Sequence, residues 1–168
     1  GRSAGTHIGG SVSFHRDITA LVEPGRSHDL VVRVLDELRP AGRQPSGKQS
    51  AEFKSHGCHY TRTTGIWQTV WLEAVDRHGI ENARIVPDLD AGCLRVHPTF
   101  LSHRRGLSFR ATLHHAGSTL ARVDVAAAPG VCAVLDVPDP RPWSPGDPFL
   151  YDLTLQVVDA GGATVDSV

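Results

Sequence analysis

The chain of 168 residues contains no methionine, only three cysteines and no excess of charge of either sign. Its 17 Lys and Arg nearly balance its 18 Asp and Glu, which gives a formal net charge of -1. Nucleic acids and anionic membranes both select surfaces of concentrated positive charge, so this balance argues against either as a partner. No apolar run approaches the ~20 residues that a membrane-spanning helix needs.

The missing methionine and the scattered cysteines limit what can be said of processing and redox state. Without an initiator Met at Gly1, and without the apolar core of a signal peptide, the chain is expected to be processed or an excerpt of something longer. Cys58, Cys93 and Cys132 are odd in number and far apart, so they imply no disulfide framework. We expect them to be reduced and partly buried. The cellular compartment stays open.

Short segments that favour strands recur along the chain, which predicts an all-β protein. Residues 107–115 alternate apolar and polar side chains, and residues 66–73 alternate with a period of two. Residues 29–36 form an almost continuous apolar run, which is typical of a strand buried on both faces. Gly, Pro, Asp and Ser separate such segments, and no window shows a sustained helical period. Strands this short and this regularly spaced suggest a β-sandwich.

The density of predicted strands changes near residue 76. Upstream the sequence has long irregular loops, whereas downstream about seven short strands fit into fewer than a hundred residues, the density of an immunoglobulin-like sandwich. We therefore expect one domain over residues 1–76 and a second over residues 77–168, with the boundary within Asp76–Gly79.

One stretch comes close to a phosphate-binding loop. Residues 42–49 read GRQPSGKQ, one position away from the pattern G-x-x-x-x-G-K-[ST]. Gln49 replaces the hydroxyl residue that would reach magnesium, and Pro45 removes a backbone donor. No helix is predicted to follow and offer its N-terminus to phosphate. The sequence therefore argues against nucleotide binding.

Other chemistry is sparse. His56, Cys58 and His59 are possible ligands for a soft metal, but no second cluster stands at zinc-site spacing, so no metal and no cofactor is expected. There is no nucleophile signature. Asp17, which precedes a β-branched pair, is expected to cap nearby backbone donors.

Five stretches in this order resemble glycoside hydrolase family 2, which comprises β-galactosidases, β-glucuronidases and β-mannosidases. They are HIGGSVSFHRDITALVEPG, HDLVVRVLD, PSGKQ, YTRTTGIWQTVWLEAV and RPWSPGDPFLYDLTLQVVDAGG, and the most specific element is Gly65–Glu73. The resemblance implies the later half of a sugar-binding jelly roll over residues 1–76. It implies an immunoglobulin-like β-sandwich over residues 77–168.

The resemblance also implies a sugar-facing loop over residues 56–64. Several family members carry an Asp six residues before the Gly of the Gly-Ile strand, where it accepts hydrogen bonds from sugar hydroxyls. This sequence has His59 there, so the preferences of those members do not transfer. Tyr60 and Arg62 are the next candidates, since an aromatic ring can stack on a sugar and a guanidinium can bridge hydroxyls. The structural core of the motifs is expected to comprise Gly65, Ile66, Trp67, Trp71 and Trp143.

The function implied by the resemblance is that of a non-catalytic piece of a retaining β-glycosidase. Family members cleave β-glycosides with two Glu on a (β/α)₈ barrel, and retaining chemistry holds the two carboxyl groups about 5–5.5 Å apart. This sequence shows no barrel and no Asn-Glu pair, so the chain alone is expected to be inactive. The implied partners are a β-glycoside and a barrel in the same polypeptide. Two alternatives are a free-standing carbohydrate-binding or adhesive β-sandwich and a metal-dependent binder acting through His56, Cys58 and His59.

Overall fold

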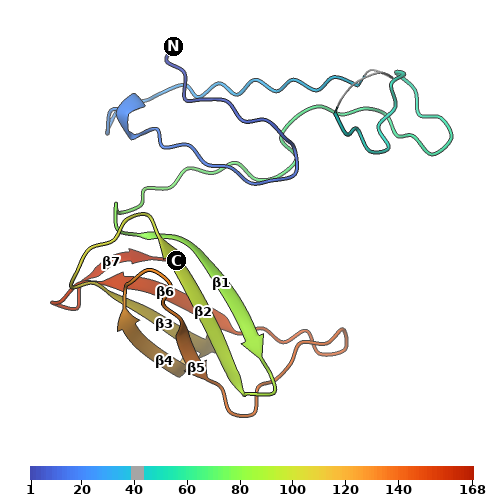
Figure 1. Cartoon of the computed structure of the whole chain (residues 1–168). Helices are drawn as coiled ribbons and strands as arrows, with labels where there is room; N and C mark the ends of the chain where they lie inside the picture. Colours follow the sequence, from blue (N-terminus) through green and yellow to red (C-terminus); the bar gives the residue numbers. More distant parts are fainter. Residues whose placement is uncertain (39–43) are drawn as a thin grey trace. The chain divides into compact units, whose positions relative to one another are not determined.

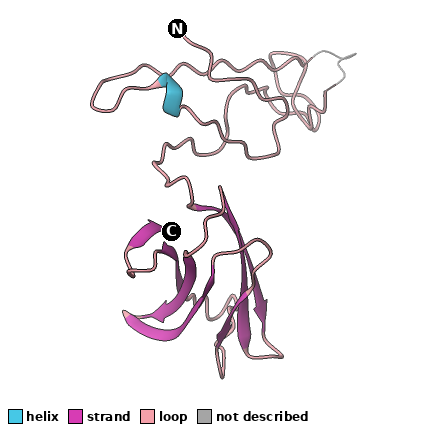
Figure 2. Cartoon of the chain, turned by 60° about the vertical axis from the view of Figure 1, so that its left-hand side comes forward, coloured by secondary structure: helices cyan, strands magenta, loops and turns pink. Residues whose placement is uncertain are grey.

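The computed structural model describes residues 1–38 and 44–168, and these divide into two compact units, Gly1–Leu72 and Glu73–Val168 (Figure 1). Seven strands and a single 3₁₀ turn, η1 (Thr19–Leu21), are the regular elements of the described residues. The predicted all-β class is therefore confirmed (Figure 2). No helix in the described residues is long and apolar enough to cross a membrane.

The second unit is a sandwich of two antiparallel sheets. One sheet has the order β1-β2-β5 and the other the order β4-β3-β6-β7. The strands are β1 (Ile80–Asp88), β2 (Cys93–Phe100), β3 (Ser108–His115), β4 (Ser118–Ala126), β5 (Ala133–Asp136), β6 (Asp152–Val158) and β7 (Thr164–Ser167). The count and the three-plus-four division are those of an immunoglobulin-like sandwich, except that β4 pairs with β3 rather than with β5.

The core lies between these two sheets and follows from the alternation in the sequence. Leu107, Phe109, Ala111 and Leu113 are all buried, as the pattern of residues 107–115 predicts. The polar residues that alternate with them, Ser108, Arg110 and His114, are half-buried. Thr112 is buried although it lies on the same, opposite face of the strand. The remaining members of the core come from several strands; they include Val96, Ala133, Leu135, Leu155 and Val157.

The β3–β4 hairpin shows how the sequence sets the sheet register. Its two turn residues, Ala116 and Gly117, have φ angles of 49° and 79°. Positive φ at both central positions defines the type I′ turn, whose twist matches that of paired strands. A register shift of one residue between Leu113 and His114 then places Arg110 directly opposite Asp124 on the neighbouring strand.

The first unit differs from the sequence prediction, because it contains no strand among its described residues. Residues 29–36 and 66–73 were both expected to be strands, and for this structure that prediction is wrong. Strands require a hydrogen-bonded partner, and neither segment has a backbone partner among the residues that the structure describes. Residues 29–35 are exposed rather than buried on two faces.

Asp17 does what the sequence predicts for it. Its Oδ1 accepts a hydrogen bond from the Thr19 N–H at 2.8 Å, at the start of η1. Hydrogen bonds from the Thr19 side chain and backbone lower the pKa of the Asp17 carboxyl. The jelly-roll identity of residues 1–76 and the boundary within Asp76–Gly79 remain predictions.

Candidate functional site

The loop that holds the predicted sugar-facing residues is closed at its base by backbone hydrogen bonds. The Tyr60 N–H donates to the Lys48 carbonyl at 2.7 Å, and the Ser50 N–H donates to the Tyr60 carbonyl at 2.7 Å. The Thr63 N–H donates to Oε1 of Gln49 at 3.0 Å. Residues 50–60 thus project from a fixed base. Gly42 and Arg43 of the near phosphate-binding pattern lie outside the described residues.

A buried serine, Ser50, orders the first part of this loop through its hydrogen bonds. Ser50 is fully buried, and its hydroxyl donates to the Lys54 carbonyl at 3.0 Å while accepting from the Glu52 N–H at 3.0 Å. The Oγ also lies 3.3 Å from Nδ1 of His56. A satisfied buried hydroxyl stabilises one loop conformation, because breaking any of its bonds leaves a polar group unpaired. The sequence gives no periodic signal for this role of Ser50.

The loop turns back on itself at His56–His59. The backbone N–H groups of these two residues donate to each other's carbonyls at 3.2 and 2.9 Å, and Gly57 supplies a φ of 53°. The two imidazole rings stack with their centroids 5.1 Å apart. Both residues are exposed, so the turn presents two imidazoles, each able to donate or accept a hydrogen bond.

This turn does not bring together enough ligands for a metal. Cys58 Sγ lies 4.0 Å from Nδ1 of His59, and the thiol is free and exposed. Across residues 1–38 and 44–168, no group of three or more His, Cys, Asp or Glu side chains is placed to hold a metal ion. The alternative of a metal-dependent binder therefore gains no support from the geometry of His56, Cys58 and His59.

Arg62 is held by Phe53, for which no sequence pattern indicates such a role. Its guanidinium carbon lies 4.1 Å from the centroid of the Phe53 ring, and Phe53 is 86% exposed. Such stacking fixes the planar guanidinium while leaving its N–H donors free for a ligand. Tyr60 is also exposed. Among the described residues, no hydrogen bond or ring contact joins His59, Tyr60 and Arg62 to one another.

The Gly-Ile-Trp motif lies beyond this loop and does not form a core here. Gly65 has a φ of 152°, a conformation that side chains rarely adopt. Trp67 is 73% exposed and donates its indole N–H to the Gly10 carbonyl at 2.9 Å, and Trp71 is 69% exposed. Ile66 is exposed as well. The physical reason is that no segment of residues 1–38 and 44–72 packs over these side chains.

Trp143 lies in a loop of the second unit that an ion pair shapes. Arg141 donates two hydrogen bonds to the Asp147 carboxylate at 2.8 and 2.6 Å, and its guanidinium lies over Phe149 at 4.3 Å. The hydrogen bond from Arg141 lowers the pKa of the Asp147 carboxyl. The Arg141 N–H also donates to the Tyr151 hydroxyl at 2.8 Å. Trp143 itself is 57% exposed, so it does not belong to the core of the described sandwich.

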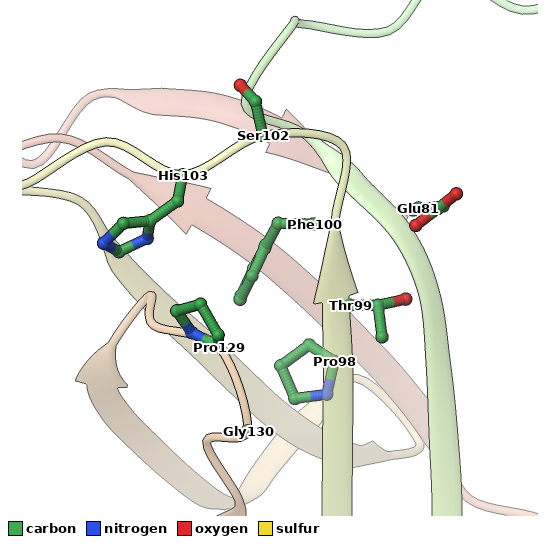
Figure 3. A pocket seen from close by; sticks show the side chains of 8 residues that line it. All are labelled: Glu81, Pro98, Thr99, Phe100, Ser102, His103, Pro129 and Gly130. Atoms are coloured by element: carbon green, nitrogen blue, oxygen red, sulfur yellow. The ribbon is translucent and has the colours of Figure 1, made fainter.

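The second unit also has a shallow hollow of about 310 Å³ at one end of the sandwich (Figure 3). The rings of Phe100, His103 and Pro129 gather around it, while Glu81 comes from β1. The hollow is mostly apolar and has two titratable side chains, Glu81 and His103. Figure 3 shows the Glu81 carboxylate pointing away from the Phe100 ring, so Glu81 and His103 do not converge on one point.

The family model of the glycosyl hydrolases family 2 matches residues 79–168, more than half of the chain. The chain belongs to glycosyl hydrolases family 2. The resemblance seen in the sequence is thereby confirmed. The family 2 match covers all seven strands of the sandwich.

Relatives of this family 2 chain extend the comparison to the first unit. A protein of Formosa agariphila named "Putative beta-glucuronidase" is 26% identical over 175 aligned positions, which cover 100% of this chain and 20% of that protein. The solved structure of a beta-D-glucuronidase of Dictyoglomus thermophilum matches 55% of this chain and 14% of that one, at 20% identity and a TM-score of 0.41. The chain thus spans about a fifth of the length of this relative.

Proposed function

We propose that this family 2 chain is the part of a retaining β-glycosidase that contributes a sugar-facing loop and a spacer sandwich. The observation that carries the proposal is the alignment of the whole chain with about a fifth of a protein named as a beta-glucuronidase. Cleavage is then the work of carboxylates on a barrel elsewhere in the longer polypeptide. That relative's name makes β-glucuronides the first substrate class to test.

The geometry of residues 50–62 supports the binding part of the proposal. The loop has a hydrogen-bonded base, a turn that presents His56 and His59, and an Arg62 side chain braced on Phe53. Preorganised donors and acceptors of this kind bind hydroxyl or carboxylate groups without first being ordered. Arg62 in particular offers a planar set of donors that matches a carboxylate.

The exposed apolar surface of the first unit supports the structural part of the proposal. Residues 29–35 and 66–72 carry Leu, Val, Ile and Trp side chains that are largely exposed. Neither segment pairs as a strand with any described part of the chain. Such surface and such unpaired backbone are costly in isolation. In the proposed enzyme, these two segments pair with strands from outside this chain and complete a jelly roll of which residues 1–76 are the later part.

The binding role is tested with the full protein encoded by the reading frame that contains this chain. Replacing His59 with Ala is expected to raise KM for a nitrophenyl β-glycoside about three- to tenfold, the effect of losing one hydrogen bond to substrate. The neighbouring exchange Cys58→Ala in the same turn is the control and is expected to leave KM unchanged. An unchanged KM in both variants would remove His59 from the pocket.

The non-catalytic role is tested with the purified chain alone. It should not hydrolyse nitrophenyl β-glucuronide, β-galactoside or β-mannoside, because none of its described groups supplies the ~8 kcal/mol or more by which enzymes lower barriers. Turnover that rises in proportion to chain concentration would contradict the proposal. Saturable sugar binding by the chain alone would favour a free-standing carbohydrate-binding protein instead.

A further inference from the structure

The residues that lead into the sandwich, Asp76–Gly79, form a turn that is hydrogen-bonded within itself. The Gly79 N–H donates to the Asp76 carbonyl at 2.8 Å, and the His78 N–H donates to Oδ1 of Asp76 at 2.8 Å. Gly79 is buried and His78 is half-buried. These residues therefore have a defined conformation, although they precede the first strand.

Ser102, in the β2–β3 loop, holds this turn from one side. Its Oγ donates to the Arg77 carbonyl at 2.7 Å and lies 2.8 Å from Nδ1 of His78. Since a hydroxyl has only one proton, Nδ1 of His78 supplies the proton for the second bond. The adjacent Leu101 N–H donates to the Gly79 carbonyl at 3.0 Å. Figure 3 shows the Ser102 hydroxyl pointing away from the hollow.

Asp166, in β7 of the four-stranded sheet, contacts the end of the turn that leads into β1. Its Oδ2 accepts a hydrogen bond from the Ile80 N–H at 2.8 Å. A Cβ on Gly79 would lie 2.6 Å from this same oxygen and 3.0 Å from the Asp76 carbonyl oxygen. The approach of Asp166 is thus possible only because position 79 has no side chain. The β2–β3 loop and β7 thus both contact the turn.

We infer that this linker anchor, Asp76–Gly79 held by Ser102 and Asp166, makes the incoming chain an integral part of the sandwich. Any bending of the chain then occurs before Asp76, in a segment that includes Glu73–Val75. These three residues are exposed, and none of them makes a hydrogen bond within the described chain. The linker anchor thus keeps the chain from bending within Asp76–Gly79. This inference does not depend on sugar binding.

Limited digestion of the full 168-residue chain with trypsin tests the linker anchor. Proteases cleave segments that can open into an extended conformation, so the Arg77–His78 bond should resist. Arg26 lies in an exposed turn of the first unit and serves as the internal reference. In the wild-type chain we expect cleavage after Arg26 at least tenfold faster than cleavage after Arg77. Equal rates at the two sites would overturn the inference.

The variant Ser102→Ala tests the cause of the protection. It removes the bonds to Arg77 and His78, and we expect cleavage after Arg77 to rise about three- to tenfold relative to Arg26. The control Ser118→Ala changes an exposed serine in the β3–β4 hairpin and should leave the ratio unchanged. An unchanged ratio in Ser102→Ala as well would contradict the assigned role of Ser102.

Hydrogen exchange in the wild-type chain provides a measurement that does not depend on the folding of a variant. The amides of Ile80 and Leu101 donate to Asp166 and Gly79, so both should exchange at least tenfold more slowly than the amides of Glu73–Val75. Comparable exchange at all these positions would show that the linker anchor is open in solution, whatever the digestion pattern.

Discussion

Phe109 is the side chain whose removal should most damage the sandwich. It is 0% exposed, lies in the central β3 strand and makes an edge-to-face contact with Phe100 at a centroid distance of 5.9 Å. Truncation of a buried Phe to Ala costs about 3–5 kcal/mol, the sum of lost apolar burial and of the cavity left behind. Domains of this size have roughly 5–15 kcal/mol of stability, so Phe109→Ala should lose a large share of it.

Urea unfolding followed by far-ultraviolet circular dichroism measures this loss. The signal reports the sandwich, since the described strands all lie in the second unit. With a denaturant slope of about 2 kcal/mol per M, the midpoint should fall by about 2 M. The matched control is Phe53→Ala, because that ring is 86% exposed and outside the sandwich; its midpoint should be unchanged. Equal shifts in both variants would refute the assignment of the core to the second unit.

Two further predictions concern the β3–β4 hairpin. Gly117→Ala places a side chain at a φ of 79° and should lower the free energy of unfolding by about 1 kcal/mol, measured in the same urea assay. For Asp124, burial raises the pKa, but hydrogen bonds from Arg110 and Arg122 outweigh it and the net pKa is lowered. A depressed folded pKa means that stabilisation is present above the unfolded value of about 3.9 and is lost as pH falls through the folded pKa. The stability difference between wild type and Asp124→Asn should therefore shrink from about pH 4 downward, as followed by thermal unfolding.

Each of these two predictions has a result that would contradict it. A Gly117→Ala variant as stable as wild type would mean that the turn is not type I′ in solution. A stability difference for Asp124→Asn that stays constant down to about pH 2 would show that the carboxylate gains nothing from the two arginines. Since the Asp124 side chain is 40% exposed, solvent screens the pair and only the direction of the effect is predicted.

The sandwich could be predicted from the sequence because the patterns that specify its strands and turns lie within short segments. Alternation in residues 107–115 fixes which side chains face inward, and a Gly at a two-residue turn fixes the hairpin. The burial of Phe109 and Leu113 follows directly from this pattern. The pairing of β4 with β3 rather than with β5 could not be predicted, since pairing partners depend on contacts between distant segments.

The first unit could not be predicted in the same way. Residues 29–36 have the composition of a strand, but composition does not supply the partner that a strand requires. Tryptophan is a residue type typical of a core, yet Trp67 and Trp71 are exposed in this structure. The loop around His59 was located only through its resemblance to family 2. The bracing of Arg62 by Phe53 joins residues nine positions apart by no recognisable periodicity.

The most direct test of the account is to read the coding DNA on both sides of these 168 codons. The account predicts an open frame that continues upstream into the first strands of a jelly roll. Downstream it predicts alternating strands and helices of a (β/α)₈ barrel that carries an Asn-Glu pair. A start codon immediately before Gly1 together with a stop codon immediately after Val168 would contradict it. The chain would then stand alone and its role would be sugar binding or scaffolding.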